Sequence, residues 1–384
     1  MLETPLDRVR DLVRGAVGFE SGVASVAPLR LPEWTRSQQF DPWIERWSAQ
    51  SLGVHLSTRS AASVVELDIE ATRILPPGES QSLFPAAIVA EVDGVVVDRV
   101  AIDEGPVVRT LSDRTAEFIA GPAVTVRLDL GAAAGERDVV VWLPHNARAV
   151  IHAVRSDAPL DPPRLTGRRV WLHHGSSVSH GIEADGPLGP WPQQAARSLG
   201  LDIVDLAIAG NAQLDPFVAR TLASIPADVV SLKLGVNVVN GDTMRARAFV
   251  PALHGFLDIV RDGHPGIPIL VCSPIACPAI EETPGPTAKG PDGRYRGTDR
   301  LVVPGDGTLT LSVVRHLVRS VVEARDDSAL YYDDGLELFG LDDAALLWDG
   351  LHPDQRGYDL IARRFVDRAR SDTPTGRAFA PVLR

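Results

Sequence analysis

The feature that most limits how this chain can fold is an alternation of short apolar segments and amphipathic helices, repeated from about residue 170 onward. The apolar segments are rich in Val, Ile and Leu, which is typical of strands that helices cover on both faces. We expect strands over residues 170–173, 202–207, 228–234, 267–272 and 330–332. We expect helices over residues 191–199, 216–224, 249–261, 311–325 and 358–369. This order predicts an α/β fold, in which a parallel five-stranded sheet carries helices on both faces.

The preceding region, residues 54–154, has the pattern of an all-β domain. Apolar and polar residues alternate over residues 124–130, and Asp93-Gly94 provides the positive φ angles of a hairpin turn within residues 87–98. Further strands are expected over residues 61–69, 139–144 and 149–154. Short strands separated by turns, with little helix between them, predict a β-sandwich of roughly a hundred residues.

Two other segments help to place the domain boundaries. Residues 6–19 have the spacing of a short amphipathic helix, and irregularly spaced aromatic residues follow between residues 34 and 47. We interpret these aromatics as core packing or a domain seam, with a sugar-stacking surface as the alternative. The proline-rich stretch 157–163 is the clearest boundary. We therefore predict a lead-in over residues 1–50, a β-sandwich over residues 51–158 and a third domain over residues 166–384.

The composition argues against several kinds of partner. A net charge of −12 disfavours binding to nucleic acid or to an anionic membrane. No apolar run approaches the ~18 residues of a membrane span, and the first residues lack the order of a signal peptide. The two cysteines, Cys272 and Cys277, are too few for a disulfide framework. We expect both to be buried thiols, and the protein to be cytoplasmic.

A candidate nucleophile lies where the first strand of the α/β region ends. The strand at residues 170–173 runs into a bend at Gly175, and serines follow where a helix would begin. A hydroxyl at this point lies at the carboxyl edge of the sheet, where open α/β folds bind their ligands. Ser177 is therefore a candidate nucleophile. The alternative is that the serines only cap the helix.

Three other short segments are expected at the same edge of the sheet. Gly210 follows the second strand, Asn237 follows the third strand, and Asp349 and His352 precede the last helix. Because parallel strands end at one edge, all four segments can converge on one crevice. Together they contain the parts that acyl transfer needs, which are a nucleophile, a base, an orienting carboxylate and oxyanion donors.

On these segments the chain resembles the SGNH (GDSL-type) esterases and acylhydrolases. Gly175-Ser176-Ser177-Val178, Gly210, Gly235-Val236-Asn237 and Asp349-Gly350-Leu351-His352 appear in the order of the family's four blocks. The resemblance implies a three-layer, flavodoxin-like α/β/α domain over roughly residues 166–372. It also implies the kind of member that has an N-terminal, jelly-roll-like β-sandwich. Two positions depart from the family pattern, since Ser176 and Val238 stand where aspartate is common.

The resemblance also implies roles for these residues. Ser177 would attack an ester carbonyl, His352 would take its proton, and Asp349 would orient the imidazole. Because Asp349 precedes His352 by three residues, we expect both side chains on one face of a helical turn. The oxyanion would be bound by the N–H groups of Ser177 and Gly210 and by the side-chain amide of Asn237.

The predicted function is a serine esterase without cofactor or metal, acting on small acyl esters, with acetylated sugars or metabolites as examples. The alternatives are an acyltransferase that uses the same site and a non-catalytic, carbohydrate-binding relative. We expect His180, Trp191 and Phe217 to line the substrate pocket. The neighbouring pair His173 and His174 is not expected to bind metal, because adjacent residues of a strand point to opposite faces. The oligomeric state is not predicted.

Overall fold

A computed structural model of the chain describes residues 1–76, 82–111, 115–163, 167–298, 300–301 and 305–383. The chain divides into two compact units. Met1–Gly167 and Asp185–Leu188 form the first unit, and Arg168–Ala184 and Gly189–Arg384 form the second. The end residues of the predicted 166–384 domain lie outside the described residues.

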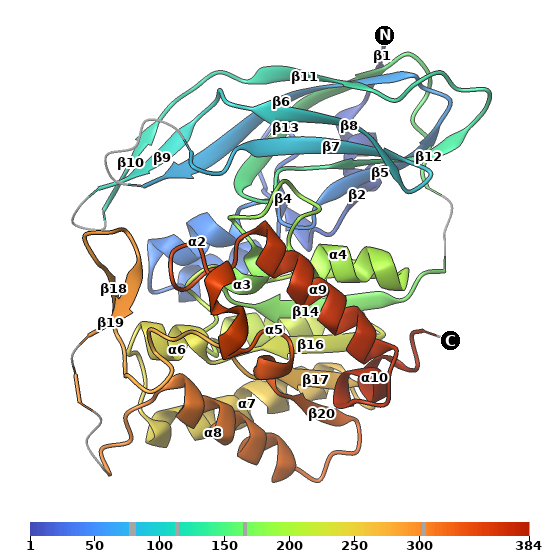
Figure 1. Cartoon of the computed structure of the whole chain (residues 1–384). Coiled ribbons are helices and arrows are strands. Elements are labelled where there is room, and N and C mark those ends of the chain that lie inside the picture. The colour runs from blue at the N-terminus through green and yellow to red at the C-terminus, as the bar shows by residue number, and fades with distance from the viewer. Residues whose placement is uncertain (77–81, 112–114, 164–166, 299, 302–304, 384) are drawn as a thin grey trace. The chain divides into compact units, whose positions relative to one another are not determined.

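The first unit contains two mainly antiparallel sheets (Figure 1). One sheet has the order β1 (Leu2–Thr4), β13 (Ala147–Ser156), β6 (Val64–Leu75), β9 (Val107–Thr110) and β10 (Ala116–Ile119), with β11 (Val124–Asp129) also paired to β6. The other has the order β2 (Val13–Arg14), β5 (His55–Ser60), β12 (Arg137–Trp142), β7 (Ala86–Val92) and β8 (Val95–Ile102). The predicted all-β sandwich is therefore confirmed.

The core of the first unit forms because alternate strand residues point inward. Leu67 and Ile69 of β6, Leu128 of β11 and Ile88 of β7 are fully buried in one apolar cluster. Asp93 and Gly94 take positive φ angles and close the predicted hairpin between β7 and β8.

The segment before the sandwich strands differs from the sequence prediction. The helix expected over residues 6–19 is shorter, because α1 (Leu6–Leu12) gives way to β2, which pairs with β5. Strand pairing with a distant segment thus replaces the last turns of that helix. The remaining short elements are β3 (Gly18–Phe19), β4 (Pro28–Leu29), η1 (Glu33–Gln38) and α2 (Pro42–Ser48).

The second unit is built on a parallel sheet of five strands, as predicted. Its order is β15 (Asp202–Asp205), β14 (Val170–Gly175), β16 (Val229–Lys233), β17 (Ile269–Cys272) and β20 (Leu330–Asp333). All four strand pairs are parallel. The strand order reverses beside β14, and open α/β sheets bind their ligands at such a point.

Helices cover both faces of this sheet (Figure 1). The His173 ring lies against Trp191 of α4 (Trp191–Leu199), while the ring of the neighbouring His174 lies against Phe256 of α7 (Ala246–Gly263). Helix α9 (Gln355–Ala369) packs with α4, and α10 (Pro374–Phe379) packs with α9. The helices α5 (Pro216–Ser224) and α8 (Leu311–Glu323) pack with α7.

The proline- and glycine-rich stretch between β17 and α8 contains a small hairpin. β18 (Thr287–Lys289) pairs with β19 (Tyr295–Gly297). The hairpin is tied to the segment before α9, since Tyr295 N–H donates to the Asp349 carbonyl at 2.7 Å. Residues 299 and 302–304 of this stretch lie outside the described residues.

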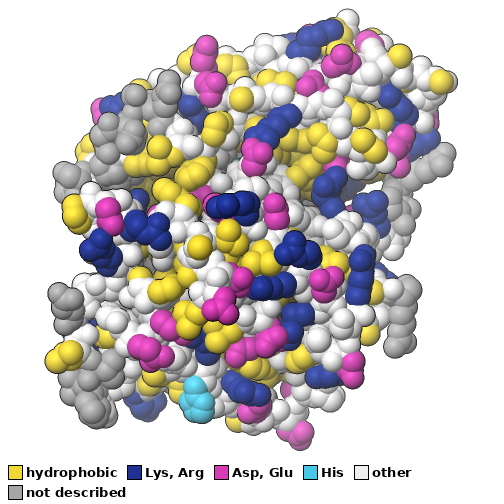
Figure 2. Space-filling model, viewed as in Figure 1, with side chains coloured by type: hydrophobic (Ala, Val, Ile, Leu, Met, Phe, Trp, Pro, Cys, Tyr) yellow, Lys and Arg dark blue, Asp and Glu magenta, His cyan; other side chains and the backbone are white. Residues whose placement is uncertain are grey.

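Side chains of Lys and Arg and side chains of Asp and Glu are interspersed on the surface that Figure 2 displays. Many of them form ion pairs, such as Arg127–Glu66 at 2.7 Å and Arg319–Glu323 at 2.9 Å. Among the helices of the described residues, none combines the length and the apolar character that a membrane crossing needs.

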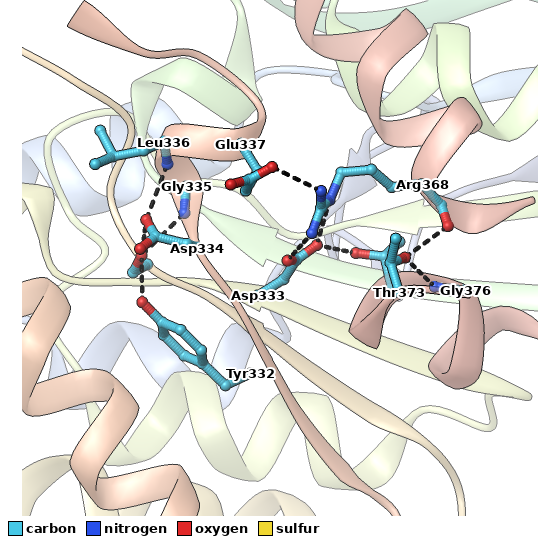
Figure 3. Close-up of polar contacts among 11 residues, drawn as sticks. Tyr332, Asp333, Asp334, Gly335, Leu336, Glu337, Arg368, Thr373 and Gly376 are labelled. Carbon is cyan, nitrogen blue, oxygen red and sulfur yellow. Dashed lines mark hydrogen bonds and ion pairs between the residues drawn. The ribbon is translucent and has the colours of Figure 1, made fainter. Parts of the chain in front are cut away.

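A polar network lies at the end of β20 (Figure 3). Asp333, the last residue of this strand, is buried and accepts hydrogen bonds from Arg368 of α9. It also accepts one from Thr375 of α10. Arg368 also donates to Glu337 at 3.0 Å. One buried carboxylate therefore fastens two helices to the edge of the sheet.

Candidate active site

Ser177 lies at the junction between β14 and the short helix α3 (Ser177–His180). Ser176 is the N-cap residue, and its hydroxyl accepts from Val178 N–H at 3.4 Å. A Cβ atom at Gly175 would lie 2.5 Å from Ser179 Oγ, so the bend requires glycine at this position. Ser177 is the first residue of the helix, where a backbone N–H has no intrahelical acceptor.

The structure brings Ser177, His352 and Asp349 into one chain of hydrogen bonds. Ser177 Oγ lies 2.9 Å from His352 Nε2, and His352 Nδ1 lies 2.8 Å from Asp349 Oδ2. The side chains of His352 and Asp349 are 12% and 2% exposed, so water competes little for these bonds. This is the geometry in which an imidazole can take a proton from a hydroxyl while a carboxylate holds its other nitrogen.

Asp349 and His352 meet in a turn, which corrects the expectation of a shared helical face. Asp349 Oδ1 accepts from the backbone N–H groups of Leu351 and His352 at 2.9 and 2.8 Å. Helix α9 begins only at Gln355. The Asp349 carboxylate therefore shapes its own loop with one oxygen and holds the imidazole with the other.

Charged neighbours shift the pKa values of this pair. Burial disfavours the imidazolium, but the charge of Glu183 and the hydrogen bond and charge of Asp349 outweigh burial, so the pKa of His352 lies above 6.5. Burial also disfavours the Asp349 carboxylate. The hydrogen bonds from His352 and Leu351 and the charge of His352 outweigh that effect and hold the pKa of Asp349 below 3.8.

The two other predicted oxyanion donors lie on segments that are hydrogen-bonded to each other. Asn237, in α6 (Val236–Asn240), accepts from Ala212 N–H through Oδ1 at 2.9 Å, which leaves its NH₂ group as the donor end. Ala209 N–H, beside Gly210, donates to His180 Nδ1 at 3.4 Å. Gly210 has φ +70°, and a Cβ atom there would meet no protein atom within 4 Å. Its positive φ therefore favours glycine, although a Cβ atom would meet no steric clash there.

The three residues predicted to line a pocket are buried in the second unit, and their part in a pocket stays a prediction. Trp191 is 1% exposed and packs against Trp171 and Phe365 with ring centroids 6.0 and 5.1 Å away. Phe217 is 3% exposed, and His180 is fully buried. Their apolar or aromatic character suited a pocket as well as a core, and sequence spacing does not separate these two roles.

Three residues near His352 were missed by the sequence analysis. Tyr295 of the β18–β19 hairpin lies edge-on to the His352 ring, with centroids 5.8 Å apart. Glu183 Oε1 lies 3.7 Å from His352 Nδ1, and Tyr358 donates to Glu183 at 2.8 Å. None of the three belongs to a motif. The position of Glu183, six residues after the candidate nucleophile, was the one available signal.

The paired histidines of β14 have structural partners. His173 Nδ1 lies 2.7 Å from Ser231 Oγ, and His174 Nδ1 lies 2.9 Å from the Leu206 carbonyl oxygen. In the part of the chain that the structure describes, no group of three or more His, Cys, Asp or Glu side chains is arranged to hold a metal ion.

Comparisons with known proteins bear on the fold and the family. Residues 174–360 match the model of the GDSL-like Lipase/Acylhydrolase family. The chain is structurally similar to the salicylyl-acyltransferase SsfX3 from a tetracycline biosynthetic pathway, with 26% identity, a TM-score of 0.75, and 93% of this chain and 92% of that chain covered. A search of curated proteins gave no match.

Two more distant structures share the fold. A family two carbohydrate esterase from Clostridium thermocellum has 16% identity and a TM-score of 0.54, with 84% of this chain and 93% of that chain covered. An acetyl xylan esterase from Butyrivibrio proteoclasticus has 12% identity and a TM-score of 0.54, with 96% and 97% covered.

The parallel sheet of the second unit thus defines an SGNH-type α/β/α hydrolase domain. Residues 174–360, within this domain, match the GDSL-like lipase/acylhydrolase family, and the first unit adds an N-terminal β-sandwich to it. The protein is accordingly an enzyme of the carboxylic ester hydrolase type.

Proposed function

We propose that the protein is a serine esterase that cleaves small acyl esters through an acyl-enzyme on Ser177. The observation that carries this proposal is the hydrogen-bonded chain from Ser177 Oγ through His352 to Asp349, with distances of 2.9 and 2.8 Å. A serine hydroxyl is a poor nucleophile without a base, and a positioned imidazole supplies that base.

The reaction proceeds in two transfers of the acyl group. Ser177 Oγ bonds to the ester carbonyl carbon while its proton passes to His352 Nε2, and the resulting oxyanion accepts bonds from Ser177 N–H, Gly210 N–H and the Asn237 amide. The carbon–oxygen bond to the alcohol then breaks, and His352 returns the proton to the leaving alkoxide. Water repeats the sequence on the acyl-enzyme and releases the acid.

His352 must be neutral to act as the base. Because its pKa is raised above 6.5, the proton is held to a higher pH than on a free histidine. The rate therefore falls as the pH drops through this raised pKa.

The acyl group is proposed to be small, with acetyl as the first candidate, and the alcohol to be a carbohydrate or another metabolite. The similarity to carbohydrate esterases at 16% and 12% identity bears on the fold alone. An activated acetate ester is therefore the suitable first substrate, since it makes no assumption about the alcohol.

Substitution of Ser177 by Ala tests the nucleophile, with Ser176→Ala as the matched control. We expect Ser177→Ala to lower the turnover of the activated acetate by about 10⁶-fold, as loss of a serine nucleophile does elsewhere. Ser176→Ala removes a cap worth about 1 kcal/mol and leaves the nucleophile in place, so its turnover is expected to stay within about tenfold of wild type. Undiminished turnover in Ser177→Ala would exclude Ser177 as the nucleophile.

A second candidate function is acyl transfer to an alcohol other than water. The similarity to a salicylyl-acyltransferase over 93% of the chain favours this candidate. Product analysis in the presence of acceptor alcohols separates the two reactions, because a transferase yields the new ester in excess over the free acid. A third candidate, a carbohydrate-binding relative without activity, predicts that a fluorophosphonate probe leaves Ser177 unlabelled.

A further inference from the structure

A second carboxylate lies beside the imidazole that the proposed mechanism uses as its base. Glu183 follows α3, six residues after Ser177 in the sequence, and its side chain is 8% exposed. Its Oε1 atom lies 3.7 Å from His352 Nδ1, the nitrogen that Asp349 holds at 2.8 Å. Two buried carboxylates therefore face the same edge of one histidine ring.

Glu183 also accepts a hydrogen bond from the phenol of a residue on another element. Tyr358, a fully buried residue of α9, donates to Glu183 Oε2 at 2.8 Å. The oxygen nearer to His352 is Oε1, so the two oxygens of the carboxylate have different partners. The Tyr358 hydroxyl thus binds one oxygen of Glu183, and the other oxygen faces His352.

The charges around His352 come from several elements and act in different directions. The groups that face it are Ser177 of α3, Glu183 of the following loop, Lys289 of β18, Tyr295 of β19 and Asp349 of its own turn. Glu183 and Asp349 favour the imidazolium, whereas Lys289 disfavours it. Burial raises the pKa of Tyr295 to about 12, so this ring contributes no charge near neutral pH.

We propose that Glu183 is a positioning residue that acts through His352, as a second counter-charge for the imidazolium formed when Ser177 gives up its proton. The proposal rests on the function proposed above, because it assigns Glu183 a part only if His352 is the base. Asp349 fixes the ring by a hydrogen bond, while Glu183, beyond hydrogen-bonding distance, contributes through its charge.

The alternative is a structural role, in which Glu183 only satisfies the buried hydroxyl of Tyr358. The two roles predict different effects of replacing Glu183 by glutamine, which has nearly the same shape but no charge. Glu183→Gln keeps an oxygen that can accept from Tyr358 but removes the charge beside His352. Tyr358→Phe removes the hydroxyl and keeps that charge.

The test measures the rate at which a fluorophosphonate probe labels Ser177 across the pH range in which histidine titrates, in the full-length protein. We expect Glu183→Gln to move the midpoint of this profile downward by about one pH unit. Its plateau rate should fall by less than about tenfold, since a base of lower pKa is a weaker base. Tyr358→Phe should leave the midpoint within a few tenths of a unit of wild type.

The outcomes separate this inference from the proposed function. An unchanged midpoint in Glu183→Gln overturns the role of Glu183 while leaving the esterase proposal intact. Equal downward shifts in both variants also overturn it, because the common cause would then be packing and not charge. If the probe fails to label Ser177 in the wild-type protein, the proposed function itself is wrong.

Discussion

Asp333 and Asp349 are two buried aspartates of the second unit with different partners. Each is 2% exposed. Asp333 binds Arg368 (Figure 3) and also the hydroxyl of Thr375, whereas Asp349 binds His352. An arginine stays protonated at any ordinary pH, while a histidine gains and loses its proton near neutrality.

The comparison shows that the partner, and not burial, decides what a buried carboxylate does. Arg368 offers Asp333 a permanent charge, so this pair fixes α9 and α10 to β20 and has no second state. His352 offers Asp349 a charge that exists in only one protonation state. The same type of side chain can therefore serve as a clamp in one place and as part of a proposed proton relay in the other.

Asp349→Asn is expected to give the largest effect of the comparison, and the effect should be on activity. The amide oxygen stays with the backbone N–H groups of Leu351 and His352, so an NH₂ group faces Nδ1 and can neither accept its proton nor stabilise the imidazolium. The corresponding change in a serine protease costs about 10⁴-fold in turnover. Thermal unfolding of the same variant should shift only slightly. A variant with near wild-type turnover would show that His352 needs no carboxylate from Asp349.

Asp333→Asn should have the opposite result, a loss of stability without a loss of turnover per folded molecule. Removing one partner of a buried ion pair costs about 3–5 kcal/mol. The Arg368 side chain is 18% exposed, so we expect the lower end of that range. For a unit of this size the thermal midpoint should fall by about 6–12 °C. A midpoint within about 2 °C of wild type would contradict the clamp.

Arg368→His should have a smaller effect on stability, and the size of this effect should depend on the pH. The new histidine would face Asp333, so its pKa in the folded state should be raised above the unfolded value. Its contribution to stability would be complete below the unfolded pKa and lost as the pH rises through the folded pKa. Unfolding midpoints of this variant should therefore fall by a few degrees between mildly acidic and mildly alkaline buffer.

The wild-type protein provides the control for the Arg368→His measurement. His352, whose pKa is also raised, contributes a dependence of the same sign in both proteins. The difference between the two curves therefore isolates the new pair. Parallel curves would mean that Asp333 does not sense the charge state of its partner.

Much of the second unit could be predicted from local sequence signals. Helices α4 and α5 have the predicted bounds, because each begins with proline at its first or second position, and α4 ends at Gly200 with φ +70°. The apolar runs located all five strands of the sheet. The β18–β19 hairpin was not predicted, since its proline- and glycine-rich surroundings resemble an open loop.

In the candidate site, too, residues within sequence motifs could be predicted, whereas residues brought in by tertiary packing could not. Ser177, His352 and Asp349 were found because they lie in segments with a recognisable order along the chain, and the structure places them within hydrogen-bonding distance. Glu183 and Tyr295 reach His352 only through tertiary packing, which leaves no periodic signal in the sequence. Trp191, which we predicted at a pocket, packs in a buried apolar cluster, and its sequence context does not separate these two roles.

The pairing of β1 with β13 has a consequence for the order of events during synthesis. Leu2 pairs with Ser156 and Val26 with Ile151, so the first and last segments of the sandwich share hydrogen bonds. A ribosome must therefore extend the chain past residue 156 before the leading strand can find its neighbour. Until then the nascent polypeptide exposes an unpaired edge, and this interval is when chaperone binding would protect it best.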